Sequence, residues 1–260
     1  MTVAGIPVFE GLALWQFAAL AAAYALAFLI KGVFGYGAVP PMILMGSLLM
    51  PPHEAVLLGG LVNLASQTFI IPDGIRHGDR ALAGRMVIYI MPALVLGVFV
   101  FKYLPSDGLQ LVVGIVLLAI LLMEGSPAWR RLEPVFARRH RLFGSISAII
   151  AGLMAGVVGA GAMVFLSIYL RTRASERMSF RGTVILIVTA ILTWRTILFV
   201  GAGLIGWSLV LQAAIMLPLA AVFLLVGTRL AQTLSNSVYF RAYQVFMIMA
   251  AVLLIVRGLI

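Results

Sequence analysis

The sequence "KGVFGYGAVPP", residues 31–41, interrupts a chain that is otherwise almost continuously apolar. It combines one lysine with three glycines and two prolines. Glycine costs backbone entropy in a helix, and proline removes a hydrogen bond from a helix interior. The stretch therefore predicts a break between two helical segments, and the surroundings of the break decide what it can do.

Those surroundings are typical of a membrane. The chain has 260 residues, of which 63% are hydrophobic and 10% are charged, whereas a soluble domain has about 25% charged residues. Apolar runs of about 15 to 20 residues recur along the whole length, close to the ~20 that a helix needs to cross the hydrocarbon. The composition predicts an all-α polytopic membrane protein in contact with the lipid bilayer, without a sizeable soluble domain. Because there is no cysteine, disulfides and thiolate metal sites are excluded.

The net charge of +10 does not indicate nucleic-acid binding, because the cations have the wrong distribution. Of the 18 Lys and Arg residues, 14 fall within the four segments 72–85, 124–141, 171–181 and 227–241. Excess Lys and Arg in short loops is typical of the cytoplasmic side of a membrane protein. With these loops inside the cell, both chain termini are expected outside.

The expected helical segments lie between and around these loops. They are residues 12–30, 37–50, 54–71, 86–104, 109–123, 142–158, 162–170, 183–200, 207–226 and 242–257. Segments 37–50 and 162–170 are short for a membrane span and are interpreted as half-helices or re-entrant pieces. The number of true spans is eight or ten on this interpretation.

The two glycine-rich breaks indicate an internal duplication. "GVFGYGA" at 32–38 reappears as "GVVGAGA" at 156–162, with five of seven positions identical, and "IMPALVLG" at 90–97 is echoed by "IMLPLAAV" at 215–222. We therefore expect a first membrane repeat at 1–125, a basic cytoplasmic linker at 126–141 and a second membrane repeat at 142–260, all within one integrated transmembrane domain.

Each repeat contains five expected segments, and an odd number inverts the second repeat relative to the first. Inverted repeats with broken helices are typical of secondary transporters, in which one repeat rocks against the other around a substrate site. Glycine loops can leave backbone N–H groups free, and a half-helix that follows adds the positive end of its dipole. Two such loops predict a cradle for an anion. The alternative is that the glycines only allow close helix packing.

These motifs resemble a known family. "KGVFGYGAVPP" after the first helix, its counterpart "GVVGAGA", "GLIGW" at 203–207 before a proline-containing helix, and the duplicated plan are similar to the TauE/SafE sulfite exporter family, also called the 4-toluene sulfonate uptake permease family. The resemblance implies a carrier of small sulfur-containing anions, such as sulfite or sulfonates, in a bacterial inner membrane. Many relatives have glycine or another small residue where this chain has Tyr36 and Ala160, so we expect a cradle of different shape.

The leading candidate for holding an anion is Arg195, because an arginine within an apolar helix is costly and its planar fork suits sulfonate oxygens. The alternative is that it extends to the membrane interface. Aligning the repeats with a four-residue gap places Gln67 opposite Arg195, with Asn63 one helical turn earlier and on the same face. The predicted substrate-binding residues are Gly35, Tyr36, Gly37, Asn63, Gln67, Gly159, Ala160, Gly161, Thr193 and Arg195, with Lys31 in a vestibule.

Other classes of function fit less well. The sequence lacks the motifs of serine hydrolases and zinc proteases, and its three histidines have no ligand spacing, so neither an enzyme, a cofactor nor a metal site is expected. A glycine-lined anion channel remains the alternative to a carrier. The expected partners are a small anion and lipid, with no nucleic acid. The oligomeric state is open, and a homodimer is one alternative.

Overall fold

The computed structural model describes residues 2–3, 6–9, 11–34, 37–125, 140–160, 162–173 and 177–230, together with positions 248, 252, 255 and 256. Most of the expected basic linker and most of the expected helix 242–257 lie outside these residues.

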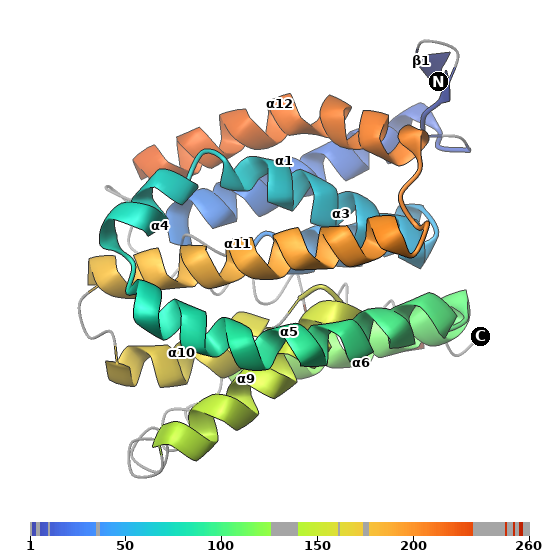
Figure 1. Ribbon diagram of the computed structural model, residues 1–260. Coiled ribbons are helices and arrows are strands. Elements are labelled where there is room, and N and C mark those ends of the chain that lie inside the picture. The colour runs from blue at the N-terminus through green and yellow to red at the C-terminus, as the bar shows by residue number, and fades with distance from the viewer. Residues whose placement is uncertain are drawn as a thin grey trace. The chain divides into compact units, whose positions relative to one another are not determined.

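The regular secondary structure of the described residues is helical except for a short N-terminal hairpin (Figure 1). In the hairpin, β1 (Thr2–Val3) pairs antiparallel with β2 (Ile6–Pro7). The helices are α1 (Leu14–Phe34), α2 (Val39–Leu49), α3 (Pro52–Gln67), α4 (Ile71–His77), α5 (Arg80–Tyr103), α6 (Ser106–Gly125), α9 (His140–Val157), α10 (Ala162–Arg173), α11 (Arg177–Gly201) and α12 (Trp207–Leu230). The predicted all-α polytopic fold is confirmed.

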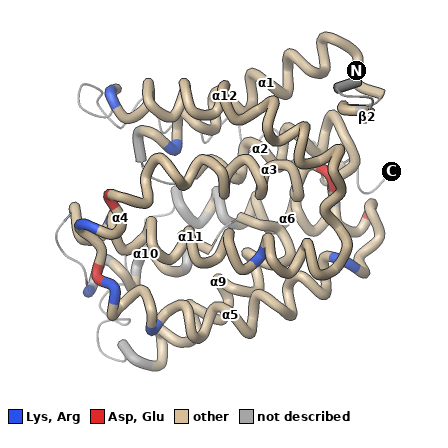
Figure 2. Tube along the Cα trace, turned by 45° about the horizontal axis from the view of Figure 1, so that its top comes forward, with Lys and Arg blue, Asp and Glu red and all other residues tan. Residues whose placement is uncertain are grey.

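Within the described ranges, four helices are long and apolar enough to cross a membrane: α1, α5, α11 and α12. In each of them only 33–39% of the apolar window is buried inside the protein, so most of each span presents apolar side chains outward, as a lipid-facing surface requires. Charged residues lie mainly near helix ends, as Figure 2 shows. The short α2 and α10 agree with the half-helices expected at 37–50 and 162–170.

The helix expected over 54–71 is wrong at its C-terminal end. α3 ends at Gln67, and α4 starts at Ile71 with a proline in its first turn. The N–H of Ile70 donates to the carbonyl of Gln67 at 2.9 Å, which closes a turn between them. Proline at a helix start costs little, because its missing N–H is not needed there. The proline in the first turn of α4 therefore fits the start of a new helix after the break.

The chain forms two compact units. The first unit comprises residues 1–66, 105–115 and 199–260. Within it, α1 packs along α12 and contacts α2. Gly32 of α1 lies against Gly227 of α12, since a Cβ on Gly32 would come 2.8 Å from the Gly227 Cα. Small residues at such a crossing let two helix backbones approach closely.

The second unit comprises residues 67–104 and 116–198. Within it, α5 packs along α9, and α10 also packs on α9. The crossing again joins two glycines, because a Cβ on Gly156 of α9 would come 2.6 Å from the Gly97 Cα of α5.

The two crossings use equivalent sequences. "LIKG" at 29–32 corresponds to "LMAG" at 153–156, and "LVLG" at 94–97 corresponds to "LLVG" at 224–227. In each crossing, the carbonyl of the leucine three residues before one glycine faces the partner glycine. The same contact therefore forms once inside each unit, and each unit joins helices from both halves of the sequence. That the repeats are inverted stays a prediction.

Candidate functional site

Arg195 lies on the membrane-spanning helix α11 of the second unit, with 2% of its surface exposed. Its guanidinium rests against the backbone of Gly159: a Cβ added there would fall on Nη1 and only 2.8 Å from Cζ and Nη2. Gly159 has a φ of +81°, which favours glycine. This position therefore needs glycine both for its backbone conformation and for the room that the guanidinium occupies.

The backbone around Gly159 corrects one expectation. The N–H groups of Val158 and Gly159 both donate to the carbonyl of Met154, at 2.9 and 3.2 Å. The general expectation that glycine loops leave backbone N–H groups free does not hold at Gly159, because its N–H closes the C-terminal end of α9. The half-helix α10 begins at Ala162, and the N–H groups of a first helical turn have no partner within the helix. The backbone donors that follow Gly159 in the sequence are thus those of the first turn of α10.

The first unit contains a second buried cation, Lys31 of α1, with 3% of its surface exposed. Its Nζ donates to Asn63 Oδ1 at 2.6 Å, to Ser66 Oγ at 2.7 Å and to the Asn63 carbonyl at 3.4 Å. It also lies 5.7 Å from the centre of the Phe28 ring. All of these partners, taken from the described residues, are neutral. The ammonium has three hydrogens, so this network uses each of them.

The break that follows Lys31 differs from the second one in its donors. α2 begins "VPPM" at Val39, and Pro40 and Pro41 have no N–H. The N–H of Met42 donates to the Ala38 carbonyl at 3.4 Å. Of the first four positions of α2, only Val39 retains an N–H that the helix does not use. The first half-helix is therefore a poorer anion site than α10.

Gln67, at the end of α3, is 1% exposed. Neither its amide oxygen nor its amide nitrogen has a hydrogen-bond partner among the described residues. Leaving a buried polar group unsatisfied costs about 1–3 kcal/mol, so such a residue in a folded protein requires an explanation. Asn63 lies one turn earlier on α3 and is occupied by Lys31.

The remaining predicted site residues have varied environments. Gly37 has a φ of +97° and would place a Cβ 3.2 Å from Ile30 Cγ2. Ala160 is buried, whereas Thr193 is exposed on α11. The residues that lie outside the described part are Gly35, Tyr36 and Gly161.

Sequence reasoning missed two polar contacts in the first unit. Ser66 completes the Lys31 network, and its position three residues after Asn63, on the same face of α3, is the signal that could have identified it. Gln212 of α12 donates to Glu54 of α3 at 3.0 Å, which no sequence motif indicates.

Within the described residues, no group of three or more His, Asp or Glu side chains could hold a metal ion. The surroundings of Lys31 and of Arg195 instead offer hydrogen-bond donors: the Lys31 ammonium, the Arg195 guanidinium and the backbone N–H groups in the first turn of α10. Such donors suit an anion rather than a cation.

Comparison with known proteins agrees with this chemistry. The chain is 28% identical over 199 residues to the "Probable sulfite/organosulfonate exporter TauE" of Cupriavidus necator, covering 75% of this chain and 76% of that protein. No solved structure matches the chain significantly. The family model "Sulfite exporter TauE/SafE" matches residues 20–254, which include both glycine breaks, Lys31 and Arg195. The chain therefore belongs to the sulfite exporter TauE/SafE family.

Proposed function

We propose that this protein is a secondary transporter that carries small sulfur-containing anions, of the sulfite or sulfonate class, across a bacterial inner membrane by alternating access. Membership of the TauE/SafE family supports transport. The name of the Cupriavidus necator relative makes sulfite and organosulfonates the first substrates to test, and export the first direction to test.

One observation carries the proposal. The charged residues that are buried within the described part of the chain are Lys31 and Arg195, and both are cations. A buried charge in a membrane-spanning helix is costly and is usually functional. Each of these two lies at a glycine-containing break, Lys31 immediately before the first and Arg195 against Gly159 of the second. Two buried cations favour an anion as the transported species.

In the second unit, we assign Arg195 the leading role in binding. Its planar fork can donate two parallel hydrogen bonds to two oxygens of a sulfite or sulfonate group. The first turn of α10 adds N–H groups and the positive end of the helix dipole. Gly159, Ala160 and Gly161 would then shape the backbone around the anion. The exposed Thr193 lies two residues from Arg195 and therefore on another face of α11, so we assign it no contact with the same anion.

In the first unit, Lys31 is the fixed positive charge, and its network with Asn63 holds it in place. Gln67, the first residue of the second unit, is the polar group that we expect to orient the substrate, because its buried amide has no other partner among the described residues. Gly35, Tyr36 and Gly37 would form the backbone of the break between α1 and α2. We place the basic loops in the cytoplasm and both termini outside, as the distribution of cations indicates.

The test is transport by the purified protein in sealed proteoliposomes. Radiolabelled sulfite inside the liposomes should leave faster when unlabelled sulfite is present outside, because the binding site of a carrier reorients faster when it holds a substrate than when it is empty. A glycine-lined channel would give no such trans-stimulation. Thiosulfate, taurine, isethionate and sulfoacetate should then be compared as competitors with carboxylates of the same size. Absence of saturable transport of every one of these anions would overturn the proposal.

A further inference from the structure

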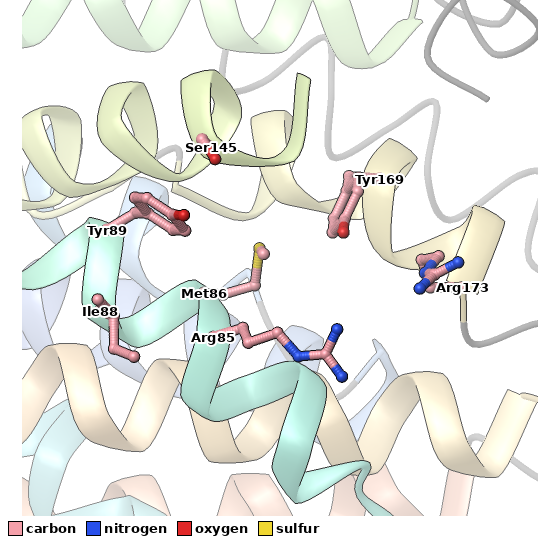
Figure 3. A pocket seen from close by; sticks show the side chains of 7 residues that line it. All are labelled: Arg85, Met86, Ile88, Tyr89, Ser145, Tyr169 and Arg173. Carbon is pink, nitrogen blue, oxygen red and sulfur yellow. The ribbon is translucent and has the colours of Figure 1, made fainter. Parts of the chain in front are cut away.

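A cavity of about 390 Å³ lies within the second unit, and Arg195 is not among the residues that line it (Figure 3). It is formed by side chains of α5, α9 and α10. Its polar residues are Arg85, Tyr89, Ser145, Tyr169 and Arg173, and none of the lining residues is acidic. Nothing in the proposed transport mechanism uses this cavity.

The polar groups of the cavity favour an anion with several oxygens. Arg85 and Arg173 approach it from two different helices, and Figure 3 shows both guanidinium groups on the Tyr169 side of Met86. Two phenolic hydroxyls and one serine hydroxyl supply further donors. Guanidinium groups bind phosphate and sulfonate oxygens in pairs, so a tetrahedral anionic group fits this set of side chains.

The cavity is built on packed helices. The ring of Tyr169 lies against the backbone of α9, because a Cβ on Gly144 would come 2.7 Å from its Cζ. Tyr169 is buried, and α9 is held to α5 by the crossing of Gly97 with Gly156. The position of the Tyr169 ring is therefore set by helix packing, whereas Arg85 and Arg173 are exposed side chains at the edge of the cavity.

An exposed apolar stripe continues from the cavity along α5. Its members are Ile88, Leu96, Phe99 and Tyr103, which are 68%, 63%, 62% and 65% exposed. Their spacing of three, four or eight residues puts them on one face of the helix. The stripe is about 22 Å long at 1.5 Å per residue, which exceeds half of the ~30 Å hydrocarbon core. Ile88 belongs to both the stripe and the cavity wall.

We propose that the cavity binds the phosphate of an anionic phospholipid, with Arg85 and Arg173 at the headgroup and one acyl chain along the exposed face of α5. The class of ligand follows from the two cations and three hydroxyls. The lipid is favoured over a free anion because the cavity wall runs directly into the apolar stripe. Basic pockets between helices on the cytoplasmic side of membrane proteins bind such headgroups, and Arg85 and Arg173 belong to two of the basic segments that the sequence places there.

The experiment measures lipid binding to the full-length protein in detergent by native mass spectrometry and by thermal shift. Phosphatidylglycerol is the anionic probe, phosphatidylcholine the neutral one, and inorganic phosphate the free anion. We expect phosphatidylglycerol to bind and to raise the melting temperature, phosphatidylcholine to do neither, and inorganic phosphate to bind about tenfold more weakly or less, because it gains nothing from the stripe.

Variants then locate the site. Arg85→Gln with Arg173→Gln should weaken phosphatidylglycerol binding about tenfold or more. The matched control, Arg76→Gln with Arg229→Gln, removes the same charge from two exposed arginines outside the cavity and should bind normally. Ile88→Asn should weaken lipid binding without changing phosphate binding. Equal binding by the two double variants, or phosphate binding as strong as the lipid, would overturn the proposal.

Discussion

The guanidinium of Arg195 on α11 occupies the space that a side chain at Gly159 would need, just beyond the end of α9. The two residues lie far apart in the sequence, yet the identity of each depends on its contact with the other. Gly159 has no Cβ, so the backbone can adopt a φ of +81° and still accept a buried cation beside it. Arg195, in turn, brings a positive charge to the end of the helix break, where the first turn of α10 begins two residues after Ala160.

Replacing Arg195 with alanine should abolish saturable transport. The substitution removes hydrogen bonds to a charged group, which are worth about 1.5–3 kcal/mol, so anion affinity should fall roughly 10-fold to 150-fold. Arg195→Lys keeps the charge but loses the planar fork and should also impair binding. Isothermal titration with sulfite, and uptake into proteoliposomes, measure the two effects.

The control for Arg195 is Arg229→Ala, which removes an exposed arginine from the last turn of α12. This variant should transport normally. Size-exclusion profiles of all variants show whether they fold. If Arg195→Ala folds and transports at the wild-type rate, Arg195 has no part in the site.

Gly159→Ala should weaken transport, because the new Cβ would displace the guanidinium of Arg195. It also forces an L-residue into the left-handed region, at a cost of about 1–2 kcal/mol. Gly203→Ala separates the two effects, since Gly203 has a φ of +71° and nothing within 4 Å of its added Cβ. Both variants should lose stability from the left-handed conformation, Gly159→Ala more because of the contact with Arg195, and only Gly159→Ala should lose anion binding. Equal transport by the two variants would show that the Arg195 contact is unimportant.

Much of the helical plan could be predicted from the sequence, because hydrophobic length and glycine breaks act locally. The expected half-helix at 162–170 corresponds to α10, and the segment 207–226 to α12. The helices often start earlier than expected, as α5 does at Arg80, since they continue beyond the apolar stretch with basic residues in their first turns. A hydropathy pattern marks where lipid begins and gives no signal for where the helix begins.

The partners of the predicted residues could not be read from the sequence. The sequence predicts Lys31 at a vestibule but does not name Asn63 and Ser66, to which its ammonium donates in the structure. A sequence shows that Gly32 permits a close crossing without naming Gly227 as the residue that it meets. Such pairings depend on long-range packing. The cavity beside Arg85 has the same origin, because its walls come from three helices.

Replacing the glycines at the two helix crossings with alanine should destabilise the protein. In Gly156→Ala the added Cβ would come 2.6 Å from the Cα of Gly97, and backbone atoms within a helix crossing have little freedom to move. We expect a clear fall in melting temperature, in line with the 1–3 kcal/mol typical of overpacking. Gly32→Ala should behave similarly, since it makes the equivalent contact in the first unit.

Gly84→Ala is the matched control for the crossings. Gly84 lies inside α5, and an added Cβ there would meet nothing within 4 Å. Alanine is favoured over glycine in a helix by roughly 0.5–1 kcal/mol, so this variant should be unchanged or slightly more stable. A loss of stability as large as that of Gly156→Ala would mean that the close crossing is not the cause.

The Lys31 network should show strong coupling between its members. Asn63→Leu leaves a buried ammonium without its shortest hydrogen bond, and we expect a loss of about 2–3 kcal/mol. Lys31→Met combined with Asn63→Leu replaces both partners by apolar groups and should recover much of that stability. Thermal unfolding of the single and double variants gives the coupling energy.

Transport by the same variants separates a structural role for Lys31 from a functional one. If Lys31 supplies positive charge to the transport pathway, the double variant should be stable and inactive. A double variant that transports normally would assign the network to folding alone.

We expect substitution of Gln67 with leucine to raise the stability of the protein and to lower its affinity for the anion. Its buried amide has no partner among the described residues, so Gln67→Leu removes an unsatisfied polar group at similar volume. We expect the variant to be more stable by about 1 kcal/mol or more, because the desolvation penalty of the amide disappears. If the amide binds the substrate, sulfite affinity should fall about fivefold or more, since a neutral hydrogen bond is worth about 1 kcal/mol. Gln67→Asn, which keeps the amide on a shorter side chain, should lose affinity without gaining stability. A leucine variant that is less stable and binds sulfite normally would instead mean that Gln67 satisfies a structural partner.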